Sequence, residues 1–287
     1  MSRVAYVNGR FVRQAEACVH IEDRGLQLAD AVYEVWALFD GRLADAEGHF
    51  ARLNRSLGEL RIAEPMSRAA LTVVIREAIR RNRVRDGLVY LQVSRGVAPR
   101  DHAFPKTPTP PGVIVTVKAV DRAAAEAKAA KGVGAVTTPE NRWGRCDIKS
   151  VSLLPNVLAR QQAAEAGAAE AWFVDDLGFV TEGAASNAWI VDADGRLRTR
   201  DTNANILRGI TRFTLIDVIR DVGMVVDERP FTPADAYAAK EAFMTGAGAL
   251  VTPIVSLDGR PIGDGVPGPV ATRLRSLYIE RAKATAI

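Results

Sequence analysis

A lysine between an irregular Arg- and Trp-rich stretch and an apolar run is the side chain in this sequence best placed to act as a nucleophile. Lys149 follows residues 142–148 (RWGRCDI) and precedes the apolar run 151–158, which is typical of the start of a helix. Its neighbours Ile148 and Val151 would partly exclude water from the amine, and desolvation favours the neutral amine over the ammonium form. A neutral amine can form a Schiff base with a carbonyl compound. Most lysines are solvated surface charges, so this hypothesis needs support from other residues.

Three further segments could contact a ligand: a strand end where a cofactor could approach the backbone, and two glycine-containing segments that could bind an anion. Glu182 ends an expected strand and is followed by the small residues 183–187 (GAASN). The stretch 208–212 (RGITR) opens an expected helix, and a helix N-terminus binds anions. Residues 245–249 (TGAGA) do not match a nucleotide fingerprint, yet such a loop lets a phosphate reach backbone amides. The plainer alternatives are a surface glutamate, a capped helix start and an ordinary turn.

A loop rich in proline carries a possible carboxylate clamp. Arg100 and His102 are two positions apart in the loop 96–105, so in extended backbone they project to the same side. An arginine fork beside an imidazole suits a carboxylate ligand. The alternative is a pair of solvated loop residues. Two further residues are ambiguous by themselves: Tyr33 fits a core aromatic residue within a strand, and Arg52 lies off the apolar stripe of a helix, as a surface arginine would.

Hydrophobic periodicity predicts the elements that must position these residues. Asn8-Gly9 is a hairpin turn, because both residues tolerate positive φ, and Ser67 is a predicted helix N-cap. In the first part of the chain we expect strands at 4–12 (a hairpin), 19–21, 31–39, 87–95 and 113–120, and helices at 47–60 and after Ser67. Further on we expect strands at 132–138, 171–174, 179–181, 188–191 and 242–244, a hairpin turn at Asp258-Gly259, and helices at 155–167, from 208, and at 270–281.

The length of 287 residues is enough for two domains. An Ala-, Lys- and Glu-rich stretch, 121–132, is typical of a linker, and its composition also suits a helix. We therefore predict a smaller N-terminal α/β domain, 1–120, the linker 121–132, and a larger C-terminal domain, 133–287, that carries Lys149. The fold class is α+β, or mixed α/β.

Composition limits the classes of function. The chain is 48% hydrophobic and 25% charged with a net charge of +4, which is typical of a soluble globular protein. Its densest basic run, 76–85, suits the outer face of an amphipathic helix better than a nucleic-acid patch. We expect no signal peptide and no membrane-spanning segment, because no apolar run has the required length.

The cysteines and histidines add two further expectations. Cys18 and Cys146 lack CxxC spacing, and the chain's three histidines form no HExxH pair, so we expect no disulfide framework and no metal site. A reducing, cytoplasmic setting fits best.

Taken together and in order, these segments resemble those of the fold-type IV pyridoxal-phosphate enzymes, most closely the D-amino-acid aminotransferases. The resemblance extends over nearly the whole chain. The segments that carry it are 22–25 (EDRG) through 32–34 (VYE), 49–53 (HFARL), 95–96 (RG) through 100–102 (RDH), 145–150 (RCDIKS), 181–183 (TEG) with 186–187 (SN), and 209–212 (GITR).

The resemblance implies a two-domain fold-type IV enzyme that binds pyridoxal 5'-phosphate. Lys149 would form the Schiff base with the cofactor. Glu182 would face the pyridine nitrogen and hold it protonated, which makes the ring an electron sink. Leu207 would be the apolar residue behind the ring. Arg52 would anchor the phosphate together with the helix entry and the phosphate loop. The phosphate-binding residues in those two segments would be Ile210, Thr211, Gly246 and Ala247.

For the substrate, the resemblance implies a carboxylate trap made of Tyr33, Arg100 and His102. In the family, the last two residues are supplied across the interface of a homodimer. Because the lysine acts on one fixed face of the substrate, the position of the trap selects the enantiomer, and the Arg100–His102 pair favours a D-amino acid. The implied reaction is transamination between a D-amino acid, such as D-alanine or D-glutamate, and a 2-oxo acid, such as 2-oxoglutarate or pyruvate.

Three alternatives remain. Two use the same cofactor: a branched-chain L-aminotransferase and an aminodeoxychorismate-lyase-like enzyme. The third is a non-catalytic protein that binds through the basic run 76–85. The chain also departs from the family pattern: residues 246–248 are Gly-Ala-Gly where hydroxyl side chains are frequent, and Ala184 and Ala185 stand where serines are common. These departures affect the expected affinity for the cofactor rather than the type of reaction.

Overall fold

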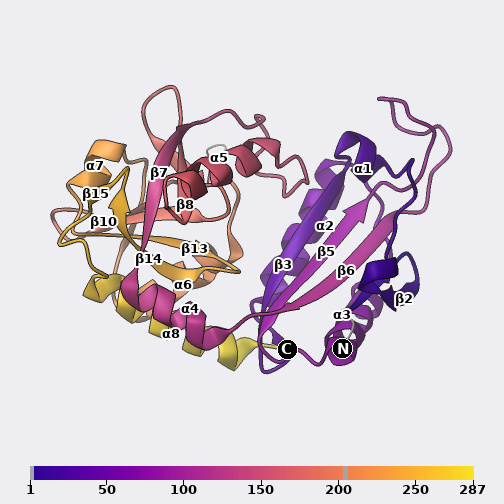
Figure 1. Ribbon diagram of the computed structural model, residues 1–287, viewed down its shortest axis with the longest axis horizontal. Coiled ribbons are helices and arrows are strands. Elements are labelled where there is room, and N and C mark those ends of the chain that lie inside the picture. The colour runs from indigo at the N-terminus through magenta and orange to yellow at the C-terminus, as the bar shows by residue number, and fades with distance from the viewer. Residues whose placement is uncertain (1–2, 203–205) are drawn as a thin grey trace. The chain divides into compact units, whose positions relative to one another are not determined.

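The computed structural model describes residues 3–202 and 206–287 of the chain, which form two compact units (Figure 1). The first unit comprises Met1–Asp121, Ile148–Ser152 and Ala286–Ile287, and the second comprises Arg122–Asp147 and Leu153–Thr285. Both units combine helices with a sheet, so the mixed α/β class is confirmed. The predicted stretch 121–132 is largely a helix, α4 (Arg122–Lys131).

An antiparallel sheet forms the centre of the first unit. Its six strands lie in the order β2-β1-β6-β5-β3-β4, so strands far apart in the sequence become neighbours. Asn8 and Gly9 both have positive φ, as the predicted hairpin turn between β1 and β2 requires. The strands are β1 (Val4–Val7), β2 (Arg10–Arg13), β3 (Ala31–Phe39), β4 (Arg42–Leu43), β5 (Gly87–Ser94) and β6 (Gly112–Ala119).

Two helices bury one face of this sheet. Along β3 and β5 side chains alternate between the core and the opposite face, because successive residues of a strand point to opposite sides. The apolar stripe of α2 (Ala46–Glu59) and the buried side of α3 (Arg68–Asn82) pack with residues such as Trp36 and Val89. The Ser67 hydroxyl accepts a hydrogen bond from Ala70 N, which confirms the predicted N-cap. Tyr33 and Gln92 lie on the other, partly exposed face.

The expected strand at 19–21 is wrong. Residues 17–20 have no regular structure, and 21–22 form a turn. Ile21 is 76% exposed, so its side chain has no core to pack against, and the short apolar pattern misled the prediction. The following residue, Asp23, instead caps a short helix, α1 (Arg24–Leu28), by accepting hydrogen bonds from Gly25 N and Leu26 N. A 3₁₀ turn, Gln14–Glu16, precedes this region.

The second unit contains a larger, mixed sheet. Among the described residues it has nine strands in the order β12-β11-β10-β13-β14-β7-β8-β9, with β15 paired to β14. Strand β7 lies parallel to both β14 and β8, whereas most other pairs are antiparallel. The strands are β7 (Val133–Pro139), β8 (Glu170–Val174), β9 (Val180–Gly183), β10 (Asn187–Val191), β11 (Leu197–Thr199), β12 (Val226–Glu228), β13 (Glu241–Gly246), β14 (Leu250–Leu257) and β15 (Arg260–Pro261).

Helices pack against the inner strands of this sheet. Figure 1 shows α4 and α8 (Pro269–Thr285) side by side, and Arg275 of α8 joins them by donating to Glu126 of α4 at 2.7 Å. The buried Arg275 also donates to Val251 O of β14 at 2.6 Å. The remaining helices of the described residues are α5 (Leu154–Glu165), α6 (Ile210–Asp221) and α7 (Pro233–Tyr237). None of the helices in the described ranges is both long and apolar enough to cross a membrane.

The two faces of α3 give a direct test of this packing. Ile75 is fully buried in the core of the first unit, whereas Val73, on the same helix, is 67% exposed. We expect Ile75→Ala to lower the free energy of unfolding by about 2–5 kcal/mol, because it leaves a cavity. Val73→Ala should change it by less than about 0.5 kcal/mol. Urea unfolding followed by circular dichroism measures both, and equal midpoints for the two variants would contradict the packing described.

Candidate active site

Lys149 is attached to the first unit by its backbone. Tyr33 N donates to Lys149 O at 2.9 Å, and Val151 N donates to Ala31 O at 3.1 Å, so residues 148–152 run antiparallel beside the start of β3. Ile148 enters the hydrophobic core of this unit, while the Lys149 side chain stays partly exposed. The sequence predicts Lys149 in the C-terminal domain 133–287, and its backbone oxygen accepts a hydrogen bond from Tyr33 N of β3. The boundaries 1–120, 121–132 and 133–287 stay a prediction.

The Lys149 amine lies over an aromatic ring predicted to belong to the site. Its Nζ is 4.2 Å from the centroid of the Tyr33 ring. Tyr33 stacks on Tyr90 with ring centroids 5.7 Å apart, and the Tyr90 hydroxyl donates to Gln92 Oε1 at 2.8 Å. Burial, with a smaller contribution from Tyr33, raises the pKa of Tyr90 to about 12, so this hydroxyl remains protonated at neutral pH. The structure thus brings together Lys149 and Tyr33 and adds Tyr90, which the sequence did not single out.

Arg52 is buried, in contrast to the surface position that its helical spacing allowed. Its Nε and Nη2 donate to the two oxygens of Glu34 at 2.7 and 2.8 Å. His49 Nδ1 lies 2.7 Å from Glu34 Oε2. Burial would raise the pKa of Glu34, but Arg52 and His49 outweigh it and lower that pKa to about 2. Burial lowers the pKa of His49, against the pull of Glu34. Two hydrogen bonds to the ionised Glu34 therefore fix the orientation of the Arg52 guanidinium group.

Hydrogen bonds from a buried arginine hold the backbone of the loop that carries Arg100 and His102. The buried Arg24 donates through Nη1 to Asp101 O at 2.6 Å and to Ala103 O at 3.2 Å. Its Nε donates to Asp30, a carboxylate shared with Arg95. Arg95 in turn lies 3.7 Å from the ring centroid of Phe104.

The predicted clamp residues themselves face solvent. The side chains of Arg100 and His102 are exposed, and the single chain does not join them to Lys149 by any hydrogen bond among the described residues. Arg24 therefore fixes the loop backbone, while the side chains of Arg100 and His102 point into solvent.

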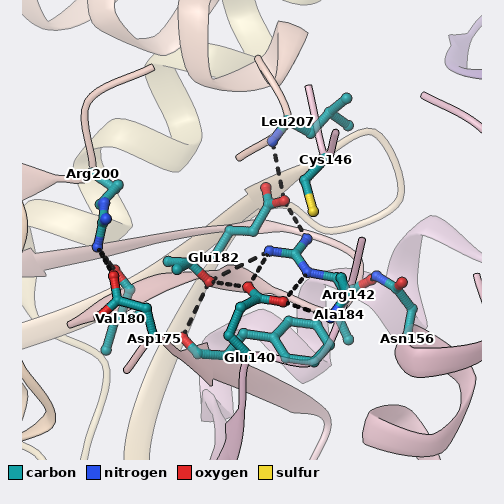
Figure 2. Close-up of polar contacts among 12 residues, drawn as sticks. Glu140, Arg142, Cys146, Asn156, Asp175, Val180, Glu182, Ala184, Arg200 and Leu207 are labelled. Atoms are coloured by element: carbon teal, nitrogen blue, oxygen red, sulfur yellow. Dashed lines mark hydrogen bonds and ion pairs between the residues drawn. The ribbon is translucent and has the colours of Figure 1, made fainter. Parts of the chain in front are cut away.

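Glu182, in β9, is the centre of a polar cluster in the second unit (Figure 2). The side chain is buried, with 4% of the residue exposed. Its Oε1 accepts from Arg142 Nη1 at 2.5 Å and from Leu207 N at 3.1 Å. Its Oε2 accepts from Asn187 Nδ2 at 3.0 Å. A surface turn glutamate, the alternative left open by the sequence, is thereby excluded.

Arg142 connects Glu182 to a second carboxylate. Its Nε and Nη2 donate to Glu140 at 2.8 and 2.6 Å. Burial would lower the pKa of Arg142, but Glu140 and Glu182 raise it above its usual value, so the guanidinium stays charged. The Cys146 thiol donates to Trp143 O at 3.1 Å, and burial raises its pKa to about 11, which leaves it a protonated, unreactive thiol.

The sequence assigned no role to Arg142 or Glu140. A buried carboxylate such as Glu182 requires a cationic or donor partner, which is the signal that could have predicted an arginine here. That requirement does not say which arginine, because the pairing depends on the sheet.

Three segments meet around Asn187. Asn187 pairs with Thr245 across β10 and β13, and its Nδ2 also donates to Leu207 O at 3.0 Å. A Cβ on Gly209 would lie only 1.9 Å from Asn187 Oδ1, and one on Gly246 would lie 3.1 Å from Ala185 O. These close approaches require glycine at Gly209 and leave little room at Gly246. The loops 183–187 and 245–249 and the start of α6 therefore converge.

The start of α6 is suited to an anion. Its N-cap, Gly209, provides no side-chain cap, so amides of the first turn, at Ile210 and Thr211, are offered without one. A helix N-terminus carries a partial positive charge and favours a phosphate. Nearby, the described cluster of Glu140, Arg142 and Glu182 has two negative charges and one positive charge, which suits a cation such as a protonated pyridine. The residues present thus fit pyridoxal phosphate. No group of three or more His, Cys, Asp or Glu side chains in the described ranges could hold a metal ion.

Comparison with known proteins decides the family. The family model described as amino-transferase class IV matches residues 31–257. This chain belongs to the class IV aminotransferases. Among its relatives, the D-alanine aminotransferase of Bacillus licheniformis is 39% identical over 269 residues, which cover 94% of this chain and 93% of that protein. The D-alanine aminotransferase of Staphylococcus haemolyticus is 38% identical over 279 residues, which cover 96% and 97% of the two chains.

Solved structures of other class IV aminotransferases share the fold. The branched-chain amino acid aminotransferase of Escherichia coli superposes with a TM-score of 0.90 at 26% identity, covering 98% of this chain and 95% of that one. The T.th. branched-chain amino acid aminotransferase, solved with pyridoxamine 5'-phosphate, superposes with a TM-score of 0.88 at 30% identity, covering 98% and 94%. The predicted fold-type IV architecture is confirmed.

The Glu34 ion pair makes stability depend on pH in a defined direction. The pKa of Glu34 is about 2 in the folded chain against an ordinary value of 4.5, so the unfolded chain binds the extra proton as the pH falls. Its contribution, on the order of 3 kcal/mol, is present above about pH 4.5 and is lost as the pH falls toward 2. We expect Glu34→Gln to flatten the fall in unfolding free energy between pH 5 and pH 3, measured by urea unfolding. The exposed Glu64→Gln is the control, and an unchanged slope in Glu34→Gln would contradict the pairing.

The hydrogen bonds from Arg24 to the loop 98–104 should slow hydrogen exchange of the loop's backbone amides. We expect Arg24→Gln to speed hydrogen exchange of the amides in this loop by about tenfold, because charge-assisted hydrogen bonds to two carbonyls are lost. Hydrogen–deuterium exchange with mass spectrometry measures this. Arg76→Gln, an exposed change on α3, should leave the loop unaffected. Unaltered exchange in Arg24→Gln would mean that the loop stays ordered without the hydrogen bonds from Arg24.

Proposed function

We propose that this class IV aminotransferase uses pyridoxal 5'-phosphate to transfer the amino group between a D-amino acid and a 2-oxo acid. D-Alanine and D-glutamate are the proposed donors, and pyruvate and 2-oxoglutarate the proposed acceptors. The observation that carries the proposal is the 39% identity to a D-alanine aminotransferase over 94% of the chain. Pyridoxamine 5'-phosphate, with which the T.th. relative was solved, is the amino form of the group proposed here.

Lys149 is the proposed covalent attachment point and proton carrier. Bound pyridoxal phosphate supplies an electron sink for the bond that breaks at the substrate's Cα. The backbone of residues 149–151 is tied to β3, so Nζ is delivered from a fixed point beside Tyr33. With the cofactor bound, Lys149 Nζ would take up the proton from the substrate's Cα and release it again, as the general acid–base group of the site.

Glu182 is the proposed partner of the cofactor's ring nitrogen. Hydrogen bonds from Arg142, Asn187 and Leu207 N fix the position and the orientation of the Glu182 carboxylate. An ionised carboxylate keeps a neighbouring nitrogen protonated. Leu207, whose backbone N–H binds Glu182, is the proposed apolar residue behind the ring.

The phosphate is proposed to be bound by backbone amides and one arginine. The neutral donors are the amides of Ile210 and Thr211 at the start of α6, that of Gly246 at the end of β13 and that of Ala247 in the following turn, and Arg52 provides the cation. Residues 246–248, Gly-Ala-Gly, carry no side-chain hydroxyl, so at this loop the chain would rely on backbone N–H groups, together with the dipole of α6.

Tyr33, Arg100 and His102 are proposed to bind the substrate carboxylate. Since Arg100 and His102 face solvent in one chain, we propose that they act on the site of a second subunit in a homodimer. Leu154, Val157 and Leu158, which lie on one face of α5 and expose more than half of their surface, support burial against another subunit. We also propose a cytoplasmic setting, supported by Cys18 and Cys146, which are both free.

A branched-chain L-amino-acid aminotransferase is the second candidate. The high TM-scores to two such enzymes favour it, at 26% and 30% sequence identity. The D-alanine aminotransferases are 36–39% identical over nearly the full chain, and side-chain identity at a site bears on specificity more than backbone shape does.

A panel of D- and L-amino acids with 2-oxoglutarate tests the proposal, with 2-oxo acid formation and the visible absorbance of the cofactor as readouts. We expect turnover of D-alanine and D-glutamate and at least about a hundredfold preference over the L-enantiomers, as a misplaced substrate loses the aligned geometry. A preference for L-leucine or L-valine would favour the second candidate. Release of pyruvate from aminodeoxychorismate would identify a lyase.

Lys149→Ala should abolish turnover while the circular dichroism spectrum and the unfolding midpoint remain near those of the parent chain. The physical reason is that the variant lacks the amine that is proposed to bind the cofactor and to carry the substrate's Cα proton. Lys118→Ala, an exposed change in the same sheet, is the control. Full activity of Lys149→Ala would reject the assignment.

A further inference from the structure

Behind Glu182 lies a chain of charges that the reaction described above does not use. Glu140 binds Arg142 through two parallel hydrogen bonds, and Arg142 reaches Glu182 through one, at Nη1 (Figure 2). The Thr181 hydroxyl donates to Glu140 Oε2 at 2.7 Å and is adjacent in sequence to Glu182. The Arg142 side chain is only 6% exposed, so it is not available to bind substrate.

The sheet positions the two carboxylates of this cluster, Glu140 just after the end of β7 and Glu182 in β9. Glu140 directly follows β7, and its N–H donates to Val174 O of β8 at 2.8 Å. The Arg142 guanidinium lies 4.5 Å from the ring centroid of Phe173, also in β8, and Glu182 is in β9. Because β7, β8 and β9 are adjacent in the sheet, the two carboxylates are held near each other, and Arg142, in the irregular segment after β7, is held by its hydrogen bonds to both of them and by its contact with Phe173.

The bonds are shared unequally between the two carboxylates. A bidentate arginine–carboxylate pair is the stronger arrangement, and Glu140 has it. Glu140 therefore neutralises most of the Arg142 charge, and the three groups together carry one net negative charge. If Arg142 were paired with Glu182 alone, that pair would be neutral and would attract a cation weakly. Burial would raise the pKa of Glu140, but Arg142 and Thr181 lower it, so this carboxyl remains ionised at neutral pH.

We propose, on the basis of the function proposed above, that Arg142 and Glu140 are positioning residues. Arg142 holds the Glu182 carboxylate in a fixed orientation, while Glu140 offsets the arginine's charge, so that the negative charge of Glu182 remains available to the cofactor's protonated ring nitrogen. The other charged groups nearby are Asp147, which pairs with Arg145, and Asp175 of the β8–β9 turn, which pairs with Arg200 after β11.

Glu140→Gln is the decisive variant, because it removes one charge and keeps the shape. We expect the dissociation constant for pyridoxal phosphate to rise roughly tenfold or more, the range found when outer-shell partners of bound groups are removed. The visible absorbance of the bound cofactor should titrate at a lower pH, because losing a negative charge disfavours the protonated form. Reconstitution of the full-length protein with pyridoxal phosphate, followed by fluorescence and by absorbance against pH, measures both effects.

Asp175→Asn is the matched control. It removes a partly buried carboxylate from an arginine in the same unit without touching Glu182. Its dissociation constant and absorbance titration should stay at the parent values. If it reproduces the changes seen in Glu140→Gln, the effect is general loosening of the unit, and the proposal is overturned.

A double variant separates a role through Glu182 from an independent one. In Glu140→Gln combined with Glu182→Gln, the cofactor affinity should equal that of Glu182→Gln alone, since Glu140 acts through that residue. Full additivity, or an unchanged Glu140→Gln, would refute the proposal. If Glu182→Gln itself leaves the cofactor affinity and titration unchanged, the proposed function fails rather than the role of Glu140.

Arg142→Lys tests the same claim if Glu140→Gln does not fold. Lysine keeps the net charge but lacks the planar fork that binds two carboxylates at once. We expect the absorbance titration to stay near the parent value, because the net charge is retained. The affinity for pyridoxal phosphate should fall, because the orientation of the Glu182 carboxylate is no longer fixed. Parent-like affinity in Arg142→Lys would show that the fork does not position Glu182.

Discussion

The chemistry proposed for this chain depends on a few backbone hydrogen bonds beside β3. Residues 148–152 are separated in sequence from the rest of the first unit, yet they pair with the start of β3 through an isolated antiparallel bridge. This pairing gives Lys149 a fixed attachment, sends Ile148 into the core and leaves the amine on the other side with Tyr33. A lysine on a free loop would lose more side-chain and backbone entropy each time it had to reach a substrate.

Local pattern predicted most of the elements. Alternation along β3 and β5, the helical stripe of α2 and the Ser67 cap are short-range properties, and each is confirmed. The strand expected at 19–21 is wrong, since its apolar residues have no partner to bury them. Whether an apolar run becomes a strand depends on what packs against it, which local sequence does not contain.

Charge pairing was much harder to predict than secondary structure. Arg52 was ambiguous because helical spacing gives its position on α2 but not the carboxylate of Glu34 across from it. Arg142 and Glu140 were overlooked because their importance arises from the adjacency of β7, β8 and β9. Lys149, Glu182 and the clamp residues were selected by resemblance to a family. Their placement in the structure, at a strand edge, in a buried cluster and on a braced loop, could not be derived from spacing alone.

One glycine sets a limit on how this protein can be engineered. At Gly209, a single added carbon would collide with the Asn187 side chain that also binds Glu182. Any larger residue would have to displace either the Asn187 side chain or the start of α6, and either change would alter the hydrogen bond from Asn187 to Glu182. Mutant libraries aimed at new substrates should therefore leave this position untouched and place their diversity on the solvent-facing loop around Arg100.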